Sequence, residues 1–174
     1  FPPFEFYNST TGEIQGFEVD LVREMAKVMK KDLKLETMGF DAIIPAILSG
    51  TIDTGAAGFS ITPERAKRVL FTIPFYKSGL TIVVPKGNPK NIQSFDDLKG
   101  KKISVQLGTT SMSFAKKIQD AQVTTFNGAG DALLNMIADF DINLRMMHVF
   151  RHQAITMVDG DQITCRPRIT CKDN

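Results

Sequence analysis

The chain has 174 residues, a formal net charge of +2, 43% hydrophobic residues and 23% charged residues. This composition is typical of a globular protein large enough for one or two lobes. Because the basic residues are scattered among acidic ones, the charge pattern does not favour nucleic-acid binding. No apolar run approaches the length of a membrane span, and no basic segment followed by an apolar one marks a signal peptide.

The first half of the chain alternates between predicted helices and strands. Apolar spacing predicts an amphipathic helix at residues 20–31, and Gly16 before it indicates a turn from a preceding hairpin. A strand is expected at 33–36, where leucines alternate with charged residues, then a short helix at 42–48 and a strand at 52–57. This order is typical of a mostly parallel α/β layer.

A second α/β unit is expected after a strand at residues 80–84 and a Pro- and Gly-rich linker or hinge at 85–89. We therefore expect a first lobe at 1–84, a second lobe at 85–140, and a tail at 141–174 that has poor periodicity. The predicted elements after the linker are a short helix from Ser94 to near Gly100, strands at 103–107 and 123–126, helices from 108–111 to about 119 and at 131–138, and a strand at 142–146.

Residues 57–65, Ala-Gly-Phe-Ser-Ile-Thr-Pro-Glu-Arg, read as a strand end followed by a helix start. Thr62 suits the N-cap and Pro63 the first helical position. The Ser60 hydroxyl and the planar, two-pronged guanidinium of Arg65 can hold a small carboxylate. An ordinary capped helix with a surface arginine explains the same residues and, for this segment taken alone, is slightly favoured.

A second segment of this kind is Gly108-Thr109-Thr110-Ser111, a glycine and three hydroxyl residues at a predicted helix start. Free N–H groups and the helix dipole make such a start an anion site, although a plain cap needs only one hydroxyl. Two such starts, one per α/β unit, would face each other across a cleft. The pair is more informative than either segment alone.

Aromatic residues give a weaker signal. Phe1 and Phe40 suit either ligand stacking or a hydrophobic core, and phenylalanine is usually found in cores. Phe40 precedes the predicted helix at a strand end, where clefts of α/β proteins open. This position favours Phe40 as a lining residue.

Metal, cofactor and catalytic signals are weak in this chain. His148, His152, Cys165 and Cys171 have an order and a spacing that match no zinc pattern, and the two cysteines permit one disulfide without requiring it. The chain has no phosphate loop, dinucleotide fingerprint or nucleophile elbow, and no histidine lies in its well-patterned part. We therefore expect no metal, no cofactor and no histidine-based catalysis.

A series of short motifs gives the chain a specific resemblance over about residues 1–139. In this order they resemble the extracellular solute-binding proteins for polar amino acids, which feed ATP-driven importers, and among these the glutamine-binding proteins most. The motifs are Phe1-Pro-Pro-Phe-Glu-Phe6, Gly16-Phe-Glu-Val-Asp-Leu21, Phe40-Asp-Ala-Ile-Ile-Pro-Ala46, residues 57–65, Pro74-Phe-Tyr76, Asp97-Leu-Lys-Gly-Lys101 and Gly108-Thr-Thr-Ser111.

The resemblance implies a type II periplasmic-binding-protein-like fold, in which two α/β lobes joined by a hinge near residues 83–87 close on an amino acid. It implies a binding protein and not an enzyme, located in the periplasm or outside the cell, with the membrane permease of an ABC importer as partner and no cofactor. The residues implied for the ligand site are Arg65, Ser60 and Thr110 for the α-carboxylate, Ala57 and Gly58 for the ammonium, Phe1 and Phe40 for the side chain, Gln106 for the side chain or opposite lobe, and Thr109 in the turn before Thr110.

Two departures from the family pattern are expected to leave the first lobe truncated. The strand that normally precedes Phe1 and carries an acidic residue is absent, and so is the return segment that completes the first lobe. The aspartate that binds the ammonium in the family cannot be assigned to Asp141 or Asp159. Exposed sheet edges would then favour pairing into a dimer.

Alternative functions therefore stay open. They are the sensor domain of a membrane receptor, an enzyme of the same fold that dehydrates cyclic amino-acid precursors, and a truncated remnant without a competent site. The phenylalanines suit the aliphatic part of glutamine and the flat head of arginine equally well, so the sequence does not indicate which amino acid binds.

Overall fold

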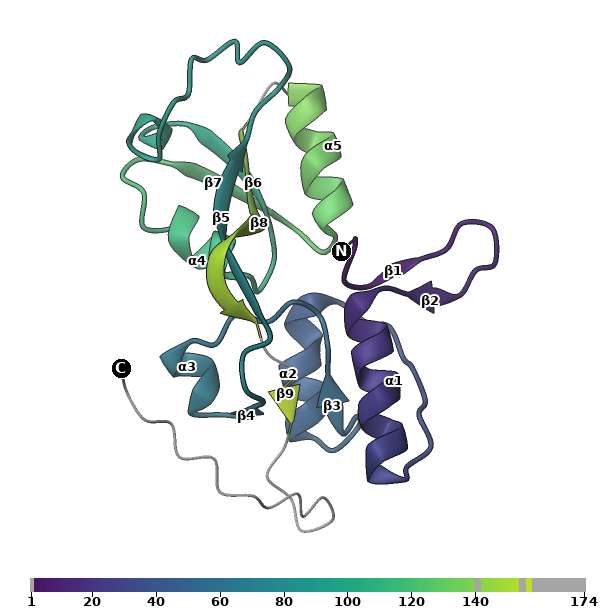
Figure 1. Ribbon diagram of the computed structural model, residues 1–174. Helices are drawn as coiled ribbons and strands as arrows, with labels where there is room; N and C mark the ends of the chain where they lie inside the picture. Colours follow the sequence, from purple (N-terminus) through teal and green to yellow (C-terminus); the bar gives the residue numbers. More distant parts are fainter. Residues whose placement is uncertain (1, 140–141, 154–155, 158–174) are drawn as a thin grey trace.

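The computed structural model describes residues 2–139, 142–153 and 156–157. Figure 1 shows two groups of elements, one above the other, linked by two long strands. The first lobe contains β1–β4, α1–α3 and β9, and the second contains β6, β7, α4, α5 and a short 3-10 helix. The helices are α1 (Phe17–Met29), α2 (Phe40–Leu48), α3 (Pro63–Ala66), the 3-10 helix η1 (Asp96–Leu98), α4 (Thr110–Ala115) and α5 (Ala129–Asp139). The strands are β1 (Phe6–Tyr7), β2 (Ile14–Gln15), β3 (Thr54–Gly55), β4 (Leu70–Phe71), β5 (Tyr76–Val83), β6 (Lys102–Gln106), β7 (Gln122–Phe126), β8 (Ile142–Gln153) and β9 (Thr156–Met157).

The second lobe is built on a four-stranded sheet with the order β5-β8-β6-β7. Strand β6 pairs in parallel with β7 and with β8, and the crossovers between these strands contain α4 and α5, as parallel pairing requires. The repeated α/β pattern predicted from the sequence is therefore confirmed here. The core of this lobe consists of Ile92, Leu98, Ile103, Val105 and Ala115, all buried.

The first lobe has much shorter strands. A hairpin of β1 and β2 precedes α1, and a three-stranded sheet has the order β3-β9-β4, with two residues in each of these five strands. One hydrophobic core of this lobe packs helix α2 against the loop before α3. The buried residues of this core are Ile43, Ile44, Ile47, Phe59 and Val69.

Two paired strands connect the lobes. Strands β5 and β8 run antiparallel from the pair Tyr76–Gln153 to the pair Val83–Asn143, and Figure 1 shows them spanning the lobes. The predicted linker at 85–89 lies beyond this crossing. Within it, the Asn88 side chain donates to the Ile92 carbonyl (2.8 Å) and accepts from the Ile92 N–H (2.9 Å), which ties this turn to the core of the second lobe.

The chain also returns to the first lobe, so the expectation that the return segment is missing is wrong. After β8, residues Thr156 and Met157 form β9, which pairs antiparallel with both β3 and β4. Two-residue strands provide too few residues for the periodicity on which the sequence prediction relied. Both Asp141 and Asp159 lie outside the described residues.

Four other predicted elements differ from the structure. The strand at 33–36 is absent, because no backbone hydrogen bond joins residues 32–38 to any other segment that the structure describes. The strand at 52–57 shortens to two residues, and the helix expected to reach about 119 ends at Ala115 in tight turns. The helix expected from Ser94 is a 3-10 turn of three residues. Phe40 begins α2 and does not follow a strand.

Candidate functional site

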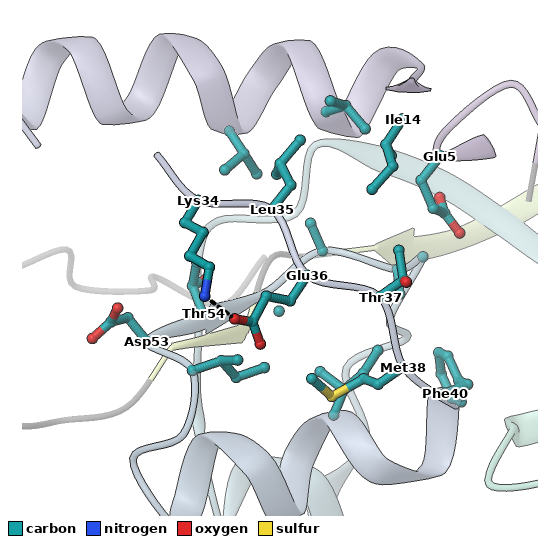
Figure 2. A pocket seen from close by; sticks show the side chains of 18 of the residues that line it. Glu5, Ile14, Lys34, Leu35, Glu36, Thr37, Met38, Phe40, Asp53 and Thr54 are labelled. Carbon is teal, nitrogen blue, oxygen red and sulfur yellow. Dashed lines mark hydrogen bonds and ion pairs between the residues drawn. The ribbon is translucent and has the colours of Figure 1, made fainter. Parts of the chain in front are cut away.

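A cavity of about 1130 Å³ opens between the lobes and extends into the first lobe. Its interlobe end, called the cleft end below, is lined by Phe40, Gly58, Arg65, Gln106, Thr109 and Thr110. Its other end is mostly apolar and lies beside α1. Figure 2 shows Glu5 and Phe40 toward one side of this cavity and Lys34 and Asp53 toward the other. The polar groups suited to an anion are at the cleft end.

Arg65 is held at the cleft end by its own helix start. The Thr62 hydroxyl accepts from the Arg65 N–H at 3.3 Å and Pro63 begins α3, as the sequence predicts. The guanidinium donates through Nη1 to the Ser60 carbonyl and through Nη2 to the Gly108 carbonyl, both at 2.9 Å. The second of these bonds joins the two lobes.

Two aromatic rings support the same guanidinium. The Cζ atom of Arg65 lies 5.4 Å from the Phe40 ring centroid and 5.2 Å from that of Phe59, and the two rings stack at 4.5 Å. These cation–π contacts fix the plane of the guanidinium. Burial lowers the pKa of Arg65, yet an arginine stays charged near neutral pH, so the cleft end presents a fixed positive charge.

The second lobe contributes the turn between β6 and α4. Thr109 is the N-cap of α4, and its hydroxyl donates to the Gln106 carbonyl (2.7 Å) and accepts from the Met112 N–H (3.2 Å). The Gln106 side chain donates to the Asn127 carbonyl at 3.1 Å. The Thr109 hydroxyl therefore serves the cap. Because α3 and α4 have only four and six residues, individual N–H groups and Arg65 matter more here than helix dipoles.

Most of the predicted site residues lie together. Phe40, Ala57, Gly58, Arg65, Gln106, Thr109 and Thr110 all line the cavity. Ser60 is buried and is not among the lining residues. Its carbonyl accepts a hydrogen bond from Arg65. Phe1 lies outside the described residues.

Glu18 is a residue that the sequence interpretation missed. It is fully buried in α1, and its two carboxylate oxygens accept from the Gly58 N–H at 3.1 and 3.0 Å. The Gly58 N–H is thus already bonded, and Glu18 fixes the loop that lines the cleft. A signal was available, because Glu18 is four residues before Val22 and eight before Ala26, on the buried face of the helix.

Glu5 is the second missed residue. It lines the cavity, and burial together with the nearby charge of Glu18 raises its pKa to about 8. Burial also raises the pKa of Glu18, while the Gly58 N–H acts in the opposite direction. Two carboxyl groups this close do not both ionise readily, so Glu5 holds the proton near neutral pH.

The described part of the chain shows no other chemical centre. It contains no cluster of three or more His, Cys, Asp or Glu side chains arranged for a metal ion. None of the helices in those residues is both long and apolar enough to cross a bilayer. The predicted weak zinc candidates Cys165 and Cys171 lie outside the described residues, as do the side chains of His148 and His152.

The model of one protein family, bacterial extracellular solute-binding proteins, family 3, matches residues 1–157. The chain belongs to this family. The match extends past Asp139 to the end of β9, in agreement with the return of the chain to the first lobe. The resemblance to solute-binding proteins for polar amino acids is therefore confirmed, and so is the type II fold of two α/β lobes joined by a hinge. The particular likeness to glutamine-binding proteins is not confirmed, since the relatives are named for other amino acids.

Individual family members show the same likeness. The chain is 34% identical over 155 residues to the ABC transporter arginine-binding protein 1 of Escherichia coli, covering 89% of this chain and 60% of that protein. It is 39% identical over 134 residues to a probable histidine-binding protein of Campylobacter jejuni, covering 77% and 51%. A solved structure of an ancestral arginine-binding protein bound to arginine superposes with a TM-score of 0.83 at 34% identity, covering 92% and 81%. The chain thus spans about half to 60% of the curated relatives it matches.

Proposed function

We propose that this member of the solute-binding family binds a polar amino acid at the cleft end, outside the cytoplasm, for delivery to an ABC importer. The observation that carries the proposal is the guanidinium of Arg65, which contacts a stacked pair of rings and donates to two carbonyls at a cavity wall. Its remaining donors suit a ligand α-carboxylate. The family match supports the same assignment.

We propose further that the ligand has a cationic side chain, with L-arginine as the first candidate. Glu5 supports this, because a carboxyl group in the same cavity ionises most readily beside a cation. The flat ring of Phe40 suits a guanidinium. The names of two relatives, an arginine-binding and a probable histidine-binding protein, are consistent with this class.

Titration calorimetry with L-arginine, L-citrulline and L-glutamine tests both proposals. Citrulline keeps the shape of arginine and loses its positive charge, so we expect clearly weaker binding of citrulline to the unaltered protein. Glu5→Gln should remove that preference. Arg65→Lys should weaken every ligand about 10- to 100-fold, as expected when one charge-assisted hydrogen bond is lost. Equal binding of arginine and citrulline would reject the cationic class, and absence of binding by all three would reject the site.

The pH dependence of arginine binding gives a second check on Glu5. If arginine binds beside the ionised carboxylate, binding below pH 8 must release the Glu5 proton, whose pKa is about 8. The affinity for arginine should then rise with pH by up to about tenfold per unit between pH 6 and pH 8. Glu5→Gln should flatten this profile.

A dehydratase activity is a second candidate, because a carboxyl group that stays protonated near neutral pH can act as a general acid. Incubation of the protein with the cyclic precursor L-arogenate tests it. Formation of phenylalanine that Glu5→Gln abolishes would support an enzyme, and no product over many hours would leave the binding function alone.

A further inference from the structure

The two lobes touch where a glycine of the second lobe meets the Cβ and backbone of an aspartate in the first lobe. Gly108, in the turn between β6 and α4, has a φ of +74°, and a Cβ atom placed on it would lie 2.8 Å from the Cβ and 3.0 Å from the Cα of Asp41. Asp41 belongs to the first turn of α2 in the first lobe. Real Cβ atoms do not approach other atoms so closely, so only glycine permits this contact.

Both sides of this contact are held by their own lobe. Helix α2 is anchored through Ile43, Ile44 and Ile47 in the first core. On the opposite side, the Leu107 N–H donates to the Phe126 carbonyl at 2.8 Å, and the residue after Gly108 caps α4. A methyl group at position 108 therefore meets the Cβ and backbone atoms of Asp41, and no flexible side-chain end lies there to be displaced.

The same residue accepts the hydrogen bond that joins the lobes. Arg65 Nη2 donates to the Gly108 carbonyl at 2.9 Å, while Nη1 stays on the Ser60 carbonyl of its own lobe. The bond forms only when the second lobe reaches the α2 start. The close approach of Gly108 to Asp41 and the hydrogen bond from Arg65 to Gly108 therefore belong to the same closed arrangement of the lobes.

We infer that Gly108 is a positioning residue that sets how far the lobes close, because its missing side chain lets the second lobe seat on Asp41 and reach Arg65. The inference deepens the proposed function, because a role of Gly108 in ligand capture requires that the cleft binds a ligand. Closure itself can be measured without a ligand. Any side chain at position 108 should shift the protein toward an open arrangement while both lobes stay folded.

Gly108→Ala is the direct test, and Gly100→Ala is its matched control. Gly100 lies in the same lobe with a similar φ of +68°, but nothing lies within 4 Å of the position of its Cβ. Both variants carry the backbone strain of alanine at positive φ, and only one carries the contact. Gly108→Asn separates the two effects further, because asparagine tolerates positive φ and still brings a Cβ.

Pulsed electron–electron double resonance between spin labels at positions 24 and 116 reports the interlobe distance. The labels are introduced through Glu24→Cys and Lys116→Cys, at exposed residues of α1 and just after α4, with both native cysteines replaced by serine. We expect a longer distance in Gly108→Ala and Gly108→Asn, and the wild-type distance in Gly100→Ala. Asp41→Gly, which removes the 2.8 Å contact, should restore part of the closure in Gly108→Ala.

A wild-type distance in both Gly108 variants would overturn the inference, as would equal lengthening in Gly100→Ala. Circular dichroism melting checks that each variant is folded. If Gly108→Ala does not fold, the interlobe distance in Gly108→Asn decides the role of Gly108. With L-arginine as the probe, a tenfold fall in the closed fraction should raise the apparent Kd about tenfold. If the unaltered protein does not bind arginine, the proposed ligand is wrong, while the distances still decide the role of Gly108.

Discussion

Two segments with the same alternating pattern have different structures in the two lobes. In β6, Ile103 and Val105 are 1% and 0% exposed, and the strand has a neighbour on each side. In the first lobe, Leu33 and Leu35 likewise alternate with polar residues, Lys34 and Glu36, yet they are 37% and 39% exposed. Their segment has no backbone partner among the described residues.

The difference shows that a strand depends on its neighbours as much as on its own sequence. Alternation decides which face of a strand is apolar, whereas hydrogen bonds to adjacent strands decide whether the strand forms. Leu33 and Leu35 line the apolar end of the cavity beside α1. We therefore expect the first lobe to be the less tightly packed of the two.

The largest expected effect compares one core isoleucine from each lobe. Ile103→Ala should cost about 4 kcal/mol of unfolding free energy, because the fully packed site cannot collapse around the loss. Ile43→Ala should cost about 2 kcal/mol, at the low end for such changes, since Ile43 already borders the cavity. Urea denaturation of both variants measures the difference. Equal losses would mean that the first lobe is packed as densely as the second.

The next effect concerns the buried acid of the first lobe. Glu18→Gln should cost about 2 kcal/mol, because the Gly58 N–H loses a charged and fully buried acceptor. Glu24→Gln is the control, as an exposed acid of the same helix paired with Lys27, and it should leave stability close to wild type. If the two variants melt alike, Glu18 does not hold the cleft loop.

The pH dependence of stability should also differ between the lobes, because Glu5 lies in the first. Its folded pKa is raised from 4.5 to about 8, so between these values the folded state binds more protons than the unfolded state. Stability of the ligand-free protein should therefore fall as pH rises from about 5 to about 8, by up to about 1.4 kcal/mol per pH unit from this group. Thermal melting of Glu5→Gln should show a flatter profile, and an unchanged profile would contradict the raised pKa.

The sequence predicted the parts of the fold that depend on local pattern. The helix start at Thr62 and Pro63, the anchor Arg65, and the turn at Gly108 were all found from residue type and spacing. Such features involve neighbours in the chain, so sequence order contains most of the information. This is why most predicted site residues lie at one cavity.

The parts that the sequence did not predict depend on contacts between distant residues. Strand β9 forms by pairing with β3 on one side and β4 on the other. A strand of two residues has no sequence pattern from which this pairing could be predicted. The bond between Glu18 and Gly58 joins residues 40 positions apart. The raised pKa of Glu5 likewise arises from folding, which brings a second carboxyl group beside it.

The smallest expected effect compares the two helix caps that face the cleft. Thr62→Ala removes the cap bond from the Arg65 N–H and a solvent-exposed bond to the Glu64 carboxylate, and should cost about 1 kcal/mol. Thr109→Ala removes the corresponding bond from the Met112 N–H and also the 2.7 Å donation to the Gln106 carbonyl, so it should cost more. Thr62→Ser and Thr109→Ser, which keep the hydroxyl, serve as controls in urea denaturation. A larger loss at Thr62 would show that the first lobe, despite its shorter strands, depends more on its cleft turn than the second lobe does.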